Sequence, residues 1–98
     1  MARQVMVHYK VKPDRIEEHE KLIRDVFAEL ALSSPAGIRY GAFKQKDGLR
    51  FVHVALITAA NNPLDAIAAF RAFSERIKER CDEPPNVVDL TPIGVFGL

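Results

Sequence analysis

The chain has 98 residues, of which 48% are hydrophobic and 28% charged, and its formal net charge is +1. This length predicts one domain spanning residues 1–98, and this composition is typical of a globular protein. The near-neutral charge argues against binding to nucleic acid or to an anionic membrane. No apolar stretch approaches the ~18 residues of a membrane span, and the single cysteine, Cys81, favours the reducing cytoplasm.

The first predicted element is a strand over residues 4–11, QVMVHYKV, because β-branched and aromatic residues dominate it. Its alternation places Tyr9 on one face and His8 on the other. Pro13 then suits the first turn of a helix. The apolar residues of this predicted helix recur at helical spacing, at Ile16, Ile23, Val26, Phe27 and Leu30. This helix is expected to end near residues 33–35.

Residues 37–57 predict a β-hairpin centred on Asp47-Gly48, a dipeptide that suits a two-residue type I′ turn. A loop of those two residues would pair Ala42 with His53 and Tyr40 with Ala55. One face would then carry Ile38, Tyr40, Ala42, Phe51, His53, Ala55 and Ile57. The other face would carry Phe43, Val52, Val54 and Leu56. Because both faces are apolar, each of them needs a cover.

Asn62-Pro63 suits the start of a second helix, which is expected to run to about Arg80. Its apolar stripe consists of Ile67, Phe70, Phe73 and Ile77. Residues 82–85, DEPP, predict a break, and residues 86–91, NVVDLT, predict a fourth strand. The order β-α-β-β-α-β favours a ferredoxin-like α+β fold. That fold has a four-stranded antiparallel sheet in the order 4-1-3-2, with both helices on one face.

Two helices on one face leave the other face bare in a monomer. We name this second face the open face, and its apolar residues are Met6, Phe43, Val52, Val54 and Leu56. Since an apolar patch of this size usually marks an interface, the sequence predicts a homodimer joined through the open faces. The apolar tail, PIGVFGL, is a second candidate contact through Ile93, Val95, Phe96 and Leu98.

Four short strings in this element order resemble the dimeric α+β barrel superfamily, and within it the antibiotic-biosynthesis-monooxygenase-like proteins. The strings are YKVKP (9–13), GIRY (37–40), RFVHV (50–54) and FRAF (70–73). The resemblance implies a dimer whose two sheets close into a barrel, with a small-molecule cavity between the helices and the sheet of each subunit. It also implies a range of activities: cofactor-independent oxygenation of aromatic substrates, haem degradation, or isomerisation or dehydration of small ring compounds.

The resemblance places one face of the sheet toward that cavity, with Val5, Val7, Tyr9, Tyr40, His53, Ala55 and Ile57. Val7, Ile57, Tyr9 and Tyr40 are therefore the candidate substrate-binding residues. The residues of the haem-degrading branch do not carry over, because its asparagine, tryptophan and iron-binding histidine align with Val7, Ile57 and Ser74. A histidine of the oxygenase branch aligns with Ala69. We therefore expect no cofactor.

His53 is the candidate catalytic residue. Its unperturbed pKa of ~6.5 suits a general base that takes a proton from a phenol-like or β-dicarbonyl substrate. Tyr9 and Tyr40 would orient that substrate through their hydroxyl groups. The alternative for all three is a core position with the polar group hydrogen-bonded to a neighbour. Ala42 and Ala55, the small residues beside His53, would leave room for a ligand.

The other polar residues have simpler interpretations. His8 is expected inside the dimer barrel, and His19 is expected to be a half-exposed surface histidine, with a place at the cavity mouth as the alternative. Three histidines on separate elements predict no metal site. Arg39 on the open face would need a carboxylate partner, which Asp89 could supply. Cys81 is expected to be a small apolar residue.

Two other function classes share this element order. RNA-recognition domains need stacking aromatics on the sheet, and of the corresponding positions here only Phe51 is aromatic. A non-catalytic dimeric ligand-binding or scaffold protein is the second class, since a fold does not imply catalysis. The prediction is a small-molecule-binding homodimer that acts as a cofactor-independent monooxygenase or isomerase on a small aromatic or polyketide-like compound, with the non-catalytic protein as the alternative.

Overall fold

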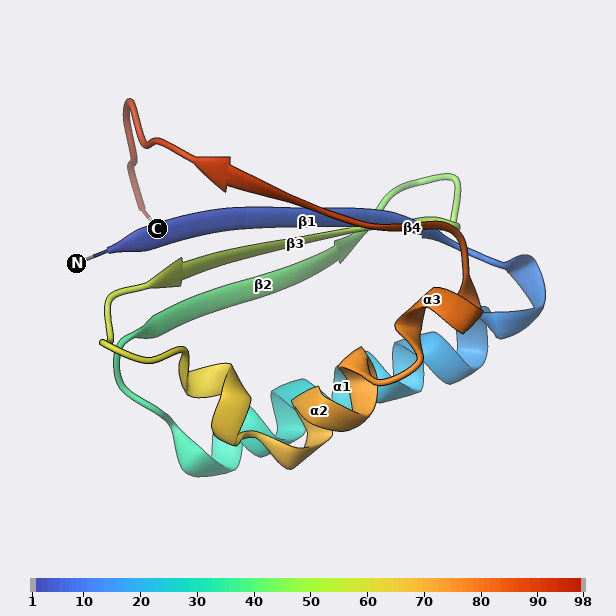
Figure 1. Cartoon of the computed structure of the whole chain (residues 1–98), viewed down its shortest axis with the longest axis horizontal. Helices are drawn as coiled ribbons and strands as arrows, with labels where there is room; N and C mark the ends of the chain where they lie inside the picture. The colour runs from blue at the N-terminus through green and yellow to red at the C-terminus, as the bar shows by residue number, and fades with distance from the viewer. Residues whose placement is uncertain (1, 98) are drawn as a thin grey trace.

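A computed structural model describes residues 2–97, and it places the helices on one face of a four-stranded antiparallel sheet (Figure 1). The strands are β1 (Arg3–Val11), β2 (Ile38–Lys44), β3 (Arg50–Ile57) and β4 (Cys81–Leu90). The helical elements are η1 (Pro13–Arg15), α1 (Ile16–Ser33), η2 (Pro63–Ala66), α2 (Ala68–Ser74) and α3 (Ile77–Arg80). The strand order β2-β3-β1-β4 confirms the predicted ferredoxin-like α+β fold.

The hairpin register is the predicted one. Ala42 lies opposite His53, and Tyr40 lies opposite Ala55. On the other side of β3, β1 pairs antiparallel with it, so that Val7 lies opposite His53. Because side chains alternate along each strand, this pairing places Val7 of β1, Tyr40 of β2 and His53 of β3 on the same face of the sheet. We name this face, which the helices cover, the helix face.

The predicted type I′ turn is wrong. Gly48 N–H donates to the carbonyl of Gln45 at 3.0 Å, and Gln45 N–H donates to the carbonyl of Arg50 at 2.8 Å, so the loop consists of residues 46–49. Of those four residues only Gly48 has a positive φ, +76°. The Asp47 carboxylate instead accepts a hydrogen bond from Arg50 N–H at 3.1 Å. A four-residue loop with the same centre gives the same strand pairing, which is why the register was predicted correctly.

The second helix is broken, which contradicts the prediction of one helix ending near Arg80. Residue 67 is extended between η2 and α2, and Arg76 adopts a left-handed φ of +60° between α2 and α3. At the second break, the Arg80 side chain donates to the carbonyls of Phe73 and Glu75. These carbonyls lie at the end of α2, where no further helical turn can satisfy them. The chain can therefore turn toward β4.

Strand β4 begins earlier than predicted, and the break predicted over residues 82–85 lies inside it. Cys81 pairs with Val11, and Glu83 pairs with Lys10. The register shifts on either side of Lys10, which identifies an irregular, bulged stretch. Because β4 is an edge strand, the missing N–H groups of Pro84 and Pro85 break no ladder with a further strand.

Helix α1 matches its prediction closely. It begins after the turn that Pro13 opens, and it ends where Ser34 adopts a left-handed φ of +41°. The N–H of Ser34 donates to the carbonyl of Leu30 at 2.8 Å, which caps the last turn. Val26 is the fully buried residue of the apolar stripe, and Ile16, Ile23 and Leu30 pack against the core cluster that contains it.

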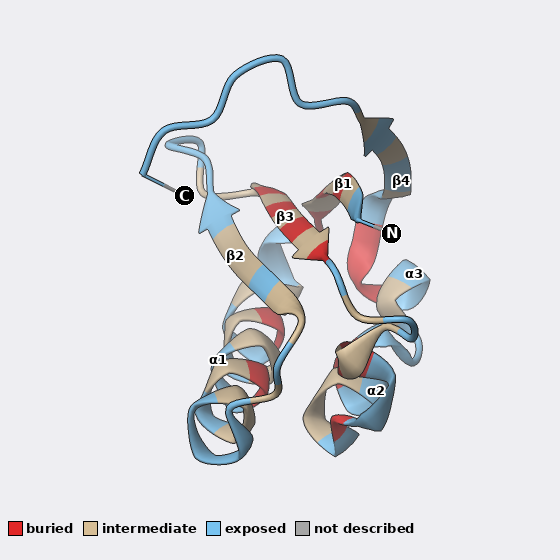
Figure 2. Ribbon diagram, turned by 90° about the vertical axis from the view of Figure 1, so that its left-hand side faces the viewer, coloured by how far each residue is buried: buried red, intermediate tan, exposed pale blue. Residues whose placement is uncertain are grey.

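The buried residues gather between the sheet and the helices, as Figure 2 shows. On the open face, Phe43 is 62% exposed, and Met6, Val52, Val54 and Leu56 are half-buried by their neighbours. The tail after β4 arches over this face (Figure 2), and Ile93 and Phe96 are fully exposed on it. Leu98, which we also expected in this contact, lies outside the described residues.

Candidate functional site

A cavity of about 240 Å³ lies between the helix face of the sheet and the second helical region. Its sheet wall consists of Val5, Val7, Tyr9, Tyr40, His53, Ala55 and Ile57. Its other lining residues come from the second helical region and from β4: Asn62, Leu64, Phe70, Phe73, Ser74, Ile77 and, in β4, Pro85. The sequence-predicted site residues, His53, Tyr9, Tyr40, Val7 and Ile57, thus all lie on one cavity wall. Their roles toward a ligand stay predictions.

The polar groups of this wall form a hydrogen-bonded chain. His53 Nδ1 lies 2.6 Å from the hydroxyl of Tyr40, and His53 Nε2 lies 2.6 Å from the hydroxyl of Tyr9. Both ring nitrogens of His53 are therefore occupied, and its exposed fraction is only 5%. Tyr40 is held in place from the helix side, because its ring stacks on Phe27 of α1 at 5.1 Å between centroids.

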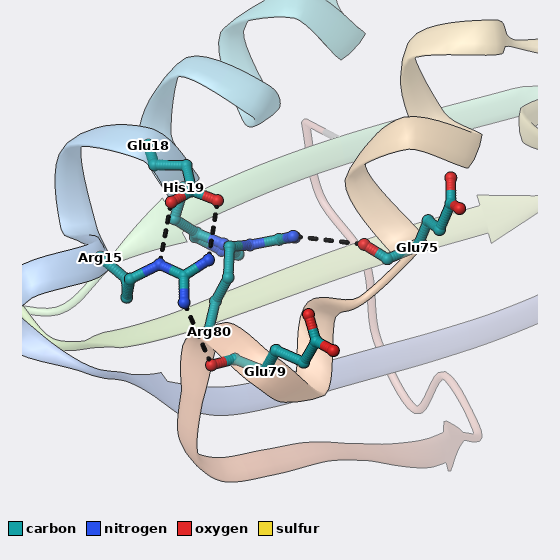
Figure 3. A network of polar contacts seen from close by, with 6 residues as sticks. All are labelled: Arg15, Glu18, His19, Glu75, Glu79 and Arg80. Carbon is teal, nitrogen blue, oxygen red and sulfur yellow. Dashed lines mark hydrogen bonds and ion pairs between the residues drawn. The ribbon is translucent and has the colours of Figure 1, made fainter.

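The chain continues into the core through a residue that the sequence prediction placed elsewhere. His19 of α1 is fully buried, so the expectation of a half-exposed surface histidine is wrong. Its Nε2 lies 2.6 Å from the hydroxyl of Tyr9, and its Nδ1 accepts a hydrogen bond from Nε of Arg80 at 3.1 Å. Tyr9 thus joins the two buried histidines. Figure 3 shows the Arg80 side chain running past His19 toward the carbonyl of Glu75.

Burial keeps the two histidines and the two tyrosines of this hydrogen-bonded chain neutral. Burial lowers the pKa of His53 to about 4. Burial, and after it the charge of Arg80, lowers the pKa of His19 to about 4. Burial also raises the pKa of Tyr9 and of Tyr40 well above the usual range of a phenol. At neutral pH the two imidazoles and the two phenols are therefore uncharged, and Arg80 carries the charge of the group.

The remaining predicted residues lie outside the cavity. His8 lies on the open face, as its alternation predicts, with its Nε2 3.1 Å from the side-chain amide of Asn86. Asp89 pairs with Arg3 at 3.4 Å, so the expected Arg39–Asp89 pair is not formed. The Cys81 thiol is buried in the core, where burial raises its pKa. These contacts are structural.

His19 and Arg80 are the members of the site that sequence reasoning missed, although each had a signal. His19 follows Ile16 by three residues and precedes Ile23 by four, which places it within the apolar stripe of α1. Arg80 continues the stripe of the second helix at the same spacing after Phe73 and Ile77. A polar residue at a stripe position is a candidate for a buried, hydrogen-bonded group.

Two broader features bear on the class of site. Within residues 2–97, no group of three or more His, Cys, Asp or Glu side chains could hold a metal ion. No helix in the same range is long and apolar enough to cross a membrane.

Comparison with known proteins gives a likeness in structure. No protein-family model matches the chain, and no curated protein sequence matches it. Several solved structures match over nearly its whole length. An antibiotic biosynthesis monooxygenase has 20% identity and a TM-score of 0.70, with 96% of this chain and 100% of that chain covered.

Two further solved structures with this fold come from named bacteria. Rv0793 from Mycobacterium tuberculosis has 18% identity and a TM-score of 0.71, with 97% of this chain and 98% of that chain covered. SnoaB, a cofactor-independent oxygenase from Streptomyces nogalater, has 14% identity and a TM-score of 0.67, with 99% and 98% covered. At such identities the likeness concerns the fold and not the activity. The chain therefore has the fold of the antibiotic-biosynthesis-monooxygenase-like proteins.

Proposed function

We propose that this chain binds a small aromatic or polyketide-like molecule in the cavity and acts on it as a cofactor-independent monooxygenase-like enzyme. The observation that carries the proposal is the composition of the cavity wall. It is apolar except for a few polar groups, among which the hydroxyl of Tyr40 and the ring of His53 lie side by side. An apolar cavity with a few convergent polar groups is the usual form of a small-molecule site.

The size of the cavity limits the ligand. A volume of about 240 Å³ lies just below the ~300 Å³ at which sites for drug-sized ligands begin. The cavity therefore suits a compound of one or two rings. Phe70 and Phe73 of α2 supply aromatic surface for such a ring, opposite the aliphatic side chains of the sheet wall.

For the chemistry, His53 remains our proposed general base, with Tyr9 and Tyr40 orienting the substrate. Because both of its ring nitrogens contact tyrosine hydroxyls, His53 can take a substrate proton only after the hydrogen-bonded chain rearranges and leaves one nitrogen free to accept it. Catalysis of this kind needs only ordinary side chains of the cavity wall. We therefore propose no cofactor and no metal.

We also propose that the chain is a single domain that forms a homodimer through its open face. This face carries a groove of about 410 Å³, to which Phe43, Val54 and Leu56 of the sheet and Val95 of the tail contribute. A second copy of the chain would cover these residues and the exposed Phe43 ring. A cytoplasmic location agrees with a chain that has one cysteine and can form no internal disulfide.

The test of binding is a titration of the protein with one- and two-ring phenols, hydroquinones and naphthols, followed by calorimetry and by oxygen consumption without added cofactor. Ala55→Leu, which fills the cavity from β3, should abolish binding while the fold is kept. Ala72→Leu, at an exposed position of α2, is the matched control and should bind normally. Equal binding by the Ala55 variant and the wild type would place the ligand elsewhere and defeat the proposal.

The alternative is a non-catalytic dimeric ligand-binding or scaffold protein, and one observation favours it. Both nitrogens of His53 already have partners, so no free base faces the cavity. Binding without any oxygen consumption, and unchanged in His53→Gln, would support this alternative. An RNA-binding function is less well supported, because Phe51 is buried beneath the helices and cannot stack on a base.

A further inference from the structure

Arg80 is a buried cation, and its side-chain hydrogen-bond partners among residues 2–97 are all neutral. It is 3% exposed, and it donates to Nδ1 of His19 and to the backbone carbonyls of Phe73 and Glu75. No carboxylate of residues 2–97 forms an ion pair with it. A buried charge without a counter-charge lowers the stability of the fold. Arg80 therefore invites the question of what its guanidinium does to the groups beside it.

The guanidinium fixes the proton positions of the first histidine. Arginine only donates hydrogen bonds. His19 Nδ1, 3.1 Å from the Arg80 Nε, must therefore accept and cannot carry a proton. The neutral ring then carries its proton on Nε2, which donates to the hydroxyl oxygen of Tyr9 at 2.6 Å.

The proton positions of Tyr9 and His53 follow from that of His19. The single hydroxyl proton of Tyr9 cannot point at the His19 donor, so it is donated to Nε2 of His53 at 2.6 Å. His53 therefore holds its proton on Nδ1 and donates it to the hydroxyl oxygen of Tyr40 at 2.6 Å. The proton of Tyr40 is left over, and no described residue accepts it.

We propose that Arg80 sets the direction in which hydrogen bonds are donated along these side chains, and so makes Tyr40 a hydrogen-bond donor toward the cavity. The cavity therefore selects ligands that present an acceptor oxygen. A ketone, a quinone or an ionised phenol has such an oxygen. A ligand that can only donate would meet the Tyr40 proton and gain nothing. The selection rests on the proposed function, because it needs a ligand in this cavity; the direction of the chain does not.

The direction can be measured without a ligand. Imidazole ¹⁵N shifts of the labelled protein at neutral pH report which nitrogen of each ring is protonated. We expect protonation at Nε2 of His19 and at Nδ1 of His53, with assignments from the variants His19→Gln and His53→Gln. The opposite tautomer at either ring overturns the proposal.

Two substitutions test the role of Arg80. Arg80→Lys keeps a donor and should keep both tautomers, whereas Arg80→Met removes the donor and should let His19 populate both tautomers. Unchanged tautomers in a folded Arg80→Met protein would show that Arg80 does not set the direction. Where Arg80→Met does not fold, the wild-type shifts still decide the direction of the hydrogen-bonded chain, and a changed tautomer in Arg80→Lys, which keeps a donor, would overturn the role of Arg80.

Ligand selection is tested with three bicyclic probes of similar size: 1-indanone, which only accepts, indole, which donates, and indene, which does neither. By calorimetry we expect 1-indanone to bind about tenfold more tightly than indene, as one added hydrogen bond allows. Indole should gain no advantage over indene. Tyr40→Phe should bind 1-indanone and indene alike.

The outcomes separate the two proposals. If no probe binds, the cavity is not a ligand site, and the proposed function fails together with the selectivity, while the ¹⁵N shifts still decide the direction of the chain. If indene binds but 1-indanone has no advantage, or if indole binds best, the selectivity is wrong and the ligand site stands. A preference for 1-indanone that persists in Tyr40→Phe would also overturn the assignment.

Discussion

Arg80 and His19 lie 61 residues apart in the sequence and in direct contact in the fold, with guanidinium Nε 3.1 Å from imidazole Nδ1. Arg80 ends α3 and His19 is the fourth residue of α1, so the contact joins the last helix to the first. Both side chains are buried, and within residues 2–97 no buried side-chain nitrogen or oxygen lacks a hydrogen-bond partner. The hydrogen-bonded chain thus runs from Arg80 and His19 in the core to Tyr9, His53 and Tyr40 in the wall of the cavity.

Tyr9→Phe should be the most destabilising hydroxyl deletion in the protein. It removes a partner from His19 and from His53 at once, and a buried polar group left without a partner destabilises the fold by about 1–3 kcal/mol. We expect a loss of roughly 2–4 kcal/mol from the free energy of unfolding in urea. Tyr40→Phe, which strips a partner from only one histidine, is the control and should lose about half as much. Equal losses would contradict the bridging role of Tyr9.

Stability should fall as the pH is lowered from about 6.5 toward 4. The pKa of His19 and of His53 is about 4 in the folded protein, against 6.5 for an ordinary histidine. Between these values the unfolded chain binds more protons than the folded one, so stability is complete above pH 6.5 and is lost on acidification. Each histidine should contribute a slope of about 1.4 kcal/mol per pH unit.

Urea unfolding measured between pH 7 and pH 5 checks this slope. In this range the carboxylates with lowered pKa values, Glu18, Glu20, Asp47 and Glu83, remain ionised in the folded protein. The double variant His19→Gln/His53→Gln should lose most of the slope if it folds, whereas His8→Gln on the open face should keep it. A flat profile in the wild type would show that the buried histidines are not held neutral.

Gly37→Ala should destabilise the fold more than any other glycine substitution tested. Gly37 has a φ of +83°, and a Cβ placed there would lie 2.6 Å from the Cβ of Ala59. Strain and overlap together should lower the free energy of unfolding by roughly 2–4 kcal/mol. Gly48→Ala, with a φ of +76° and open space around it, isolates the strain and should lose only about 1 kcal/mol. Gly94→Ala should be neutral.

Val54→Lys should convert the proposed dimer into a monomer. Val54 lies at the centre of the open face, between Met6 of β1 and Gly41 of β2. A lysine there would bury an ammonium group in a sheet-to-sheet interface, which costs several kcal/mol. Light scattering should give twice the chain mass for the wild type and the chain mass for the variant. Leu32→Lys, on an exposed residue of α1 that is 88% accessible, is the matched control.

The strand pairing and the cavity face could be predicted from the sequence because both depend on local patterns. Alternation within β1, β2 and β3 decides which side chains share a face, and the centre of the hairpin loop decides the register. The turn type was mispredicted because residues 46–49 form a larger loop around the same centre. The break at Arg76 could not be predicted, because it depends on a tertiary contact. The guanidinium of Arg80, beyond the turn, donates to the carbonyls of Phe73 and Glu75 at the end of α2.

The sequence by itself determined the element order, the ferredoxin-like sheet and the set of residues that faces the helices, because periodicity and turn residues act over short distances along the chain. Only the tertiary structure decided that His19 is buried, that it meets Tyr9 and Arg80, and that both nitrogens of His53 are occupied. These contacts join segments 10 to 61 residues apart. A hydrogen bond depends on positions within tenths of an ångström, and no local pattern fixes the packing of α1 against α3 and the sheet to that precision.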